Sequence, residues 1–158
     1  MINGKTVHFI GIGGIGMSGL AEVFHCYGYS VQGSDLRNSR STDRLEKMGV
    51  TIKIGHRPEN IEGADQVVYS SCIKDTNPEY MAAKLKGLPI LKRMEALAKL
   101  MQDKKAIAIS GAHGKTTTTS LISILLINAG LDPTVFIGAD VHFLKGNAKY
   151  GQSDIMVT

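Results

Sequence analysis

The chain has 158 residues, a formal net charge of +4 and 43% hydrophobic residues, which is enough for one generous domain or a small domain plus part of another. Its basic residues are scattered among acidic ones and form no run interleaved with aromatic side chains, which argues against a nucleic-acid partner. A mildly positive field of this kind suits anionic small molecules.

A glycine motif follows the first predicted strand. Residues 6–10 read as a buried strand, Gly11-Ile-Gly-Gly-Ile-Gly16 follows directly, and residues 17–27 are predicted to be a helix. In a G-x-G-x-x-G motif, Gly11 permits the tight turn, Gly13 lets a diphosphate approach the backbone, and Gly16 lets the helix pack on the strand. Asp35, just beyond a second strand at 29–33, stands where a carboxylate accepts hydrogen bonds from ribose hydroxyls. The pattern predicts a nucleotide site, and the alternative is a glycine turn without a ligand.

Strands and helices then alternate along the chain. The predicted elements are a helix at 43–48, strands at 50–54 and 66–69, a helix from Asn77-Pro78 to Gly87, a strand at 88–91, and a helix at 93–101 with Met94, Leu97, Ala98 and Met101 on one face. Such alternation predicts a parallel sheet with right-handed crossovers. His56, Ser70 and Ser71 follow strand ends, where open α/β sheets bind ligands.

A second nucleotide unit is predicted to begin after the polar segment 102–105, giving domains at 1–101 and 102–158. A strand at 105–109 enters Gly111-Ala-His-Gly-Lys-Thr-Thr117, and an apolar helix-like run at 121–129 follows. This is a shortened phosphate loop, since Ile109 occupies the position of the usual first glycine. Lys115 is expected to reach the β- and γ-phosphates, the loop N–H groups to bind phosphate oxygens, and the Thr116 hydroxyl to bind Mg²⁺.

The rest of this unit is predicted to contain a strand at 134–137, a loop at Gly146-Asn147 and a strand at 155–157. The predicted fold class is α/β, with a Rossmann-like parallel sheet domain followed by the first part of a P-loop-type α/β ATPase domain. No acidic partner for Mg²⁺ stands in the expected context, because Asp154 begins its strand instead of ending it.

The remaining reactive side chains form no further motif. The five histidines show no paired metal spacing, and apart from His56 and His113 they are interpreted as ordinary surface or loop residues. Cys26 and Cys72 lack the spacing of a zinc or redox motif, and Cys72 is interpreted as a small packing residue. No signal peptide or apolar span long enough to cross a bilayer is visible. We therefore expect a cytoplasmic protein without a membrane partner.

Four stretches together resemble the Mur ligases of peptidoglycan synthesis. They are residues 7–19, Gly33-Ser-Asp35, Ser70-Ser71 and, above all, Ser110 to Thr119. The resemblance covers the whole chain, and the shortened phosphate loop is that family's own form. Ala112 and Cys72 are small departures, since the family commonly has Thr and Ala there. The larger departure is length, because the family has three domains and takes a metal-binding Glu from a stretch after the one matched by Thr158.

The resemblance implies an ATP- and Mg²⁺-dependent ligase, and it is greatest to the members that join L-alanine to the lactyl carboxylate of UDP-N-acetylmuramate through an acyl phosphate. It assigns the UDP-sugar to Gly11, Gly13, Gly14, Ile15, Gly16, Ser18 and Asp35, with His56, Ser70 and Ser71 as weaker candidates. It assigns ATP to Gly111, Ala112, His113, Gly114, Lys115, Thr116 and Thr117, with Lys115 catalytic and Thr116 at the metal. These residues alone are expected to bind the UDP-sugar without ligase turnover.

Two other functions stay open. A non-catalytic nucleotide-sugar-binding module would need the same glycine motif. An NAD-dependent oxidoreductase would use that motif too, although it has no need of a second phosphate loop. Binding of UDP-N-acetylmuramate or of NADH distinguishes them.

Overall fold

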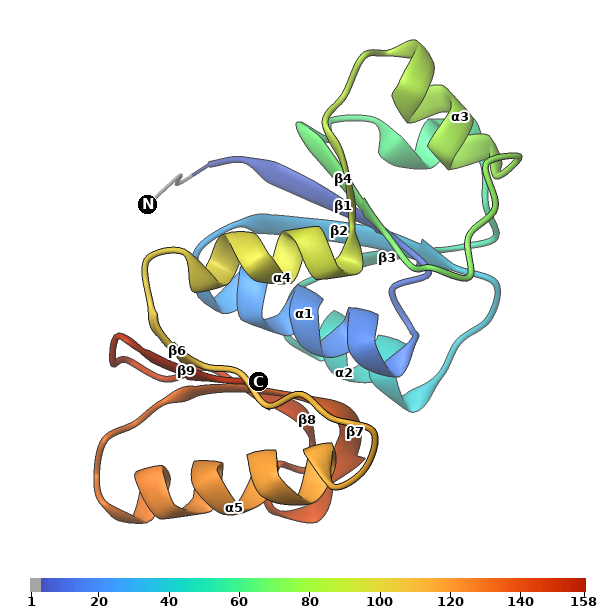
Figure 1. Ribbon diagram of the computed structural model, residues 1–158. Helices are drawn as coiled ribbons and strands as arrows, with labels where there is room; N and C mark the ends of the chain where they lie inside the picture. Colours follow the sequence, from blue (N-terminus) through green and yellow to red (C-terminus); the bar gives the residue numbers. More distant parts are fainter. Residues whose placement is uncertain (1–3) are drawn as a thin grey trace.

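The computed structural model describes residues 4–158, so the first three residues of the predicted domain 1–101 lie outside it. Residues 6–92 contain a five-stranded sheet in the order β3-β2-β1-β4-β5, with every neighbouring pair parallel (Figure 1). Its strands are β1 (Thr6–Ile10), β2 (Ser30–Asp35), β3 (Thr51–Ile54), β4 (Gln66–Tyr69) and β5 (Ile90–Lys92). This is the Rossmann strand order, and it confirms the predicted fold class.

Helices cover both faces of this sheet (Figure 1). One face carries α1 (Ile15–Cys26), α2 (Arg40–Lys47) and α4 (Arg93–Met101), and the other carries α3 (Pro78–Leu85) and the 3₁₀ helix η1 (Pro58–Ile61). Alternate side chains of β1 point to opposite faces. Phe9 therefore joins the core beneath α1, whereas Ile10 joins a smaller core with residues such as Ile61 and Ala83.

Local capping explains where two of these helices begin. The Asn77 side chain accepts hydrogen bonds from the backbone N–H groups of Glu79 and Tyr80, and Pro78 is the first helical residue, which confirms the predicted start of α3. In α2, Ser39 and Thr42 form a capping box, so this helix begins at Arg40, ahead of the predicted Asp43.

The predicted face of α4 is half right, since Leu97 and Met101 lie on the buried side whereas Met94 and Ala98 are exposed. Met94 is 58% exposed, and the buried side chains are Ala96 and Leu97, with Leu100 and Met101 partly buried. Helical spacing alone allows the buried face to include either Met94 and Ala98 or Ala96 and Leu100. The packing of α4 beside α1 buries the second set.

A second sheet lies below the first in Figure 1, in the order β6-β9-β7-β8. Its strands are β6 (Lys105–Ile107), β7 (Thr134–Val141), β8 (Gly146–Lys149) and β9 (Ile155–Val157), and α5 (Lys115–Asn128) covers its outer face. β6 and β7 are parallel to β9, whereas β8 is antiparallel to β7. The predicted loop at Gly146-Asn147 is therefore wrong. These residues open β8 after the 3₁₀ helix η2 (His142–Leu144), because Lys145 adopts a left-handed conformation that turns the chain.

α1 lies between the two sheets (Figure 1). Its Leu20 and Phe24 share one core with Phe136, Ala148 and Met156 of the second sheet. The two sheets are thus joined by a continuous apolar core. The predicted domain boundary between residues 101 and 102 stays a prediction. Within residues 4–158, no helix combines the length and the apolar character needed to span a bilayer.

Candidate functional site

The glycine motif forms a turn at the carboxyl end of β1. Gly11 has a φ of +79°, and the N–H groups of Gly11 and Ile12 both donate to the Ser34 carbonyl of β2. Gly14 is the N-cap of α1 and is exposed with Ile15. The N-terminus of α1 thus opens to solvent at the edge of the sheet, where it can receive an anion.

Asp35 is the last residue of β2, and its carboxylate binds this turn. One oxygen accepts the Gly13 N–H at 2.8 Å and the other accepts the Leu36 N–H at 2.7 Å. A methyl group added to Gly13 would lie 2.9 Å from the first of these oxygens, so the second glycine of the motif is needed for this approach. Asp35 therefore shapes the glycine turn, and its predicted contact with ribose stays a prediction.

Other predicted residues vary in their access to this edge. Ser70 lies beside the turn, with its Cβ 3.4 Å from a methyl group built on Gly11, and Ser71 is exposed. Ser18 is buried, and its hydroxyl donates to the Ile15 carbonyl within α1. The structure thus brings Ser70 to the glycine turn and leaves the Ser18 hydroxyl inside the helix. Cys72 is exposed, so its interpretation as a packing residue is wrong.

A buried polar network lies on the α3 face, beneath the glycine turn. The Glu79 carboxylate is fully buried and accepts hydrogen bonds from Ser34 Oγ and Asn60 Nδ2, both at 2.5 Å, and it lies 3.0 Å from His8 Nε2. Burial opposes ionisation of Glu79, but the hydrogen bonds from His8, Ser34 and Asn60 outweigh it and lower its pKa to about 2. The network therefore contains a fixed negative charge.

Two histidines belong to this network. His8 is completely buried in β1, so its interpretation as a surface or loop residue is wrong. His56, a predicted ligand contact, lies 3.1 Å from Ser34 Oγ and 3.3 Å from Glu79 through Nδ1. Glu79 carries no motif that sequence reasoning could have used. The one signal is its place in the first turn of a capped helix, and that place is ordinary for an acidic residue.

The shortened phosphate loop lies between β6 and α5. Gly111 and Gly114 have φ values of +150° and +78°, and Gly114 is the N-cap of α5. The Lys115 ammonium donates to the carbonyls of Gly111 at 2.5 Å and Ala112 at 3.2 Å. The side chain thus folds over its own loop and holds a positive charge at the helix start. His113, Thr116 and Thr117 are exposed beside it.

Thr116 is the residue predicted to contact Mg²⁺. Thr116 offers an exposed hydroxyl, whereas residues 4–158 contain no group of three His, Cys, Asp or Glu side chains that could hold a metal ion. Mg²⁺ keeps several water ligands and binds through few protein groups plus phosphates, so Thr116 fits as one ligand among several.

A cavity of about 310 Å³ lies between α4 and the phosphate loop. Its lining includes Arg93, Leu97, Lys115, Thr116, Phe136 and Thr158. Arg93 also contacts the glycine motif, because a methyl group built on Gly16 would lie 2.9 Å from Nη1 of Arg93. Gly16 thus makes room for an arginine, and its predicted role in packing the helix on the strand stays a prediction. Arg93, which contacts Gly16, therefore lines the same cavity as Lys115 and Thr116 of the phosphate loop.

Comparison with known proteins gives the family of the chain. Residues 6–105 match the model of the Mur ligase family, catalytic domain. UDP-N-acetylmuramate--L-alanine ligases of Jannaschia sp. and Aquifex aeolicus are 55% and 52% identical over 96% and 98% of this chain, and the matches cover 32% and 34% of those proteins. The chain thus spans about a third of the length of the curated relatives it matches.

Solved structures show the same likeness. The UDP-N-acetylmuramate-alanine ligase of Thermotoga maritima superimposes with a TM-score of 0.86 at 32% identity, over 96% of this chain and 36% of that one. A UDP-N-acetylmuramate:L-alanyl-gamma-D-glutamyl-meso-diaminopimelate ligase from Neisseria meningitides gives 0.88 at 28% identity, over 97% and 51%. Because the family model matches well over half of the residues, with the glycine motif inside the matched range, this chain belongs to the Mur ligase family.

Proposed function

We propose that this chain forms the UDP-sugar-binding part and the phosphate loop of an ATP-dependent enzyme that joins L-alanine to the lactyl carboxylate of UDP-N-acetylmuramate. The observation that carries the proposal is that Arg93, which contacts Gly16 of the glycine motif, lines the same cavity as Lys115 and Thr116 of the shortened phosphate loop. The names of the relatives supply the substrates. We assign residues 1–101 to the UDP-sugar and residues 102–158 to the start of the ATP-binding domain, in a protein of the cytoplasm.

The reaction proposed is activation of a carboxylate by phosphoryl transfer. A carboxylate oxygen of the sugar attacks the γ-phosphorus of ATP and ADP leaves, after which the amine of L-alanine attacks the acyl phosphate and phosphate leaves. Most of the catalysis in such a reaction is positioning and charge neutralisation. Mg²⁺, when bound, neutralises charge on the β- and γ-phosphates.

This chain's own residues would hold the two reactants. The N–H groups at the start of α1 would bind the UDP diphosphate, with Asp35 fixing the shape of the turn. The loop from Gly111 to Thr117 would bind the ATP phosphates, with Lys115 neutralising the oxygens that gain charge and Thr116 contacting the metal. His56, Ser70 and Ser71 are proposed as further contacts at the carboxyl ends of β3 and β4.

A non-catalytic nucleotide-sugar-binding activity is the second candidate for these 158 residues by themselves. The observation in its favour is that residues 4–158 contain no cluster of three His, Cys, Asp or Glu side chains that could hold a metal ion. An NAD-dependent oxidoreductase is third, since a nicotinamide enzyme leaves the phosphate loop without a use.

Calorimetric titration of the chain with UDP-N-acetylmuramate and with NADH tests the proposal. We expect binding of the UDP-sugar, no binding of NADH, and no phosphate release from ATP that depends on L-alanine. Binding of NADH without binding of the UDP-sugar would overturn the ligase and the nucleotide-sugar module together. Phosphate release that depends on L-alanine would show that these residues suffice for turnover.

A further inference from the structure

Arg93 occupies an unusual electrostatic position. It is the first residue of α4, and its guanidinium lies against Gly16, the second residue of α1. Helix N-termini carry partial positive charge, so a cation at two of them is unfavourable unless an anion is near. Lys115, at the start of α5, lines the same cavity. Among residues 4–158, no carboxylate lies within ion-pair distance of Arg93.

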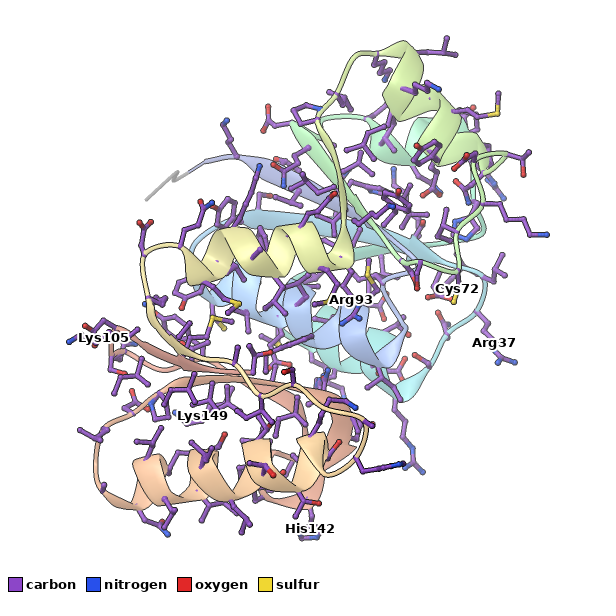
Figure 2. The ribbon with its side chains drawn as sticks, viewed as in Figure 1. Arg37, Cys72, Arg93, Lys105, His142 and Lys149 are labelled. Carbon is purple, nitrogen blue, oxygen red and sulfur yellow. The ribbon has the colours of Figure 1, made fainter. Side chains whose placement is uncertain are left out.

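The contact with Gly16 fixes where the guanidinium points. A methyl group on Gly16 would lie 2.9 Å from Nη1 and 3.2 Å from Cδ of Arg93, so the side chain lies flat on the glycine. Figure 2 shows Arg93 at the start of α4, on the side that faces α1. From there it reaches the cavity whose other wall carries Lys115 and Thr116. Arg93 thus lies between the turn proposed for the diphosphate and the loop proposed for ATP.

We propose that Arg93 is a substrate-binding residue that holds the carboxylate of the nucleotide-sugar in this cavity, facing Lys115. This inference rests on the proposed function. A substrate bound at the glycine turn must extend its acid group into the cavity to meet the γ-phosphate. A guanidinium binds a carboxylate through two parallel hydrogen bonds, which orients the group as well as attracting it. Gly16, the third glycine of the motif, thereby leaves room for the arginine that positions the acid group.

The test compares two ligands that differ only at the acid. UDP-N-acetylglucosamine has the nucleotide, the diphosphate and the sugar of UDP-N-acetylmuramate but lacks the lactyl group. In calorimetric titrations of the 158-residue chain, R93A should weaken binding of UDP-N-acetylmuramate about 10- to 100-fold, the effect of one charged hydrogen-bonding group, and leave binding of UDP-N-acetylglucosamine unchanged. R93K should restore part of the difference, and K99A, an exposed change on the same helix, should affect neither ligand.

Substitution of Gly16 provides a second, independent test of the role of Arg93. G16A should displace the guanidinium and weaken binding of UDP-N-acetylmuramate, and in the R93A background this part of the loss should be absent. Equal weakening of both ligands by R93A would overturn the assignment to the carboxylate, as would unchanged affinity for both. If the unaltered chain binds neither ligand, the proposed function itself fails. If it binds both and R93A changes nothing, only the role of Arg93 fails.

Discussion

The Ser34 hydroxyl donates a 2.5 Å hydrogen bond to the Glu79 carboxylate, while the Ser34 carbonyl accepts the N–H groups of Gly11 and Ile12. One serine therefore connects a buried negative charge on one face of the sheet to the glycine turn at its edge. The carboxylate also binds His8, His56 and Asn60. We infer that Glu79 stabilises the strand ends from which the candidate site is built.

Replacement of Glu79 by glutamine should destabilise the chain by about 2–4 kcal/mol, because an amide cannot accept hydrogen bonds at both ends of the group and leaves buried donors unpaired. The free energy of unfolding in urea measures this loss. E46Q makes the same chemical change at an exposed position of α2 and should stay within about 0.5 kcal/mol of the unaltered chain. An equally small effect of E79Q would show that the network contributes little.

The same carboxylate predicts a loss of stability in acid. Its pKa is about 2 in the folded chain, below the ordinary value of 4.5, so the unfolded state takes up the proton first as the pH falls. The contribution is fully present above about pH 4.5 and is lost between that pH and about 2. Its size is on the order of 3 kcal/mol. Urea unfolding measured across this range should show the decline in the unaltered chain and a flatter profile in E79Q. Parallel profiles for the two proteins would contradict the assignment to Glu79.

The order of elements and both loops could be predicted because each depends on local signals. Apolar alternation with glycines at turns marks the strands of the first sheet, and Asn77-Pro78 marks the start of α3 through capping that involves only neighbouring residues. The strand end, the glycine turn and the helix start around Gly11 likewise lie in one short stretch. Local chemistry was therefore enough for the fold class.

The contacts that join distant segments could not be predicted. Glu79 meets His8 only because α3 folds onto the sheet, and Gly16 meets Arg93 only because α4 packs beside α1. Gly146 and Asn147 are residue types that favour turns, yet pairing with β7 makes them part of a strand. In each case the local sequence is compatible with more than one structure, and tertiary packing determines which one forms.

Lys115→Met should remove ATP binding without affecting the UDP-sugar site. The ammonium holds the carbonyls of Gly111 and Ala112 and carries the charge that would face the phosphates. Methionine keeps a similar length without charge, and we expect affinity for ATP to fall at least about 10-fold while affinity for UDP-N-acetylmuramate is retained. Competition with a fluorescent ATP analogue measures the first and calorimetry the second.

The control for this experiment is K86M, at the exposed C-cap of α3, which should bind both ligands normally. Retained ATP affinity in K115M would show that the loop binds no nucleotide phosphate through this lysine. A parallel loss of both ligands would point to misfolding instead, and thermal unfolding of K115M would reveal it.

Replacement of Gly19 by alanine should destabilise the chain although alanine favours helix, because Gly19 lies in close contact with Asn147. The Asn147 side chain donates to the carbonyls of Ile15 at 2.6 Å and Ile137 at 3.4 Å, so it joins α1 to the second sheet. A methyl group on Gly19 would lie 2.5 Å from Asn147 Nδ2. Alanine gains up to about 1 kcal/mol in helix propensity. Overpacking of a buried contact costs about 1–3 kcal/mol, so we expect a net loss of unfolding free energy in G19A.

A double-mutant cycle separates this clash from a general effect on α1. N147A should also destabilise the chain, since it leaves the carbonyls of Ile15 and Ile137 with fewer donors. Combining G19A with N147A should cost less than the sum of the two single changes, because the smaller side chain at 147 accommodates the methyl group. G138A, at a glycine with no neighbouring atom within 4 Å of an added methyl group, should leave stability nearly unchanged. Additive losses in the double variant would show that Gly19 and Asn147 do not restrict each other, and the close approach of α1 to β8 would then need another cause.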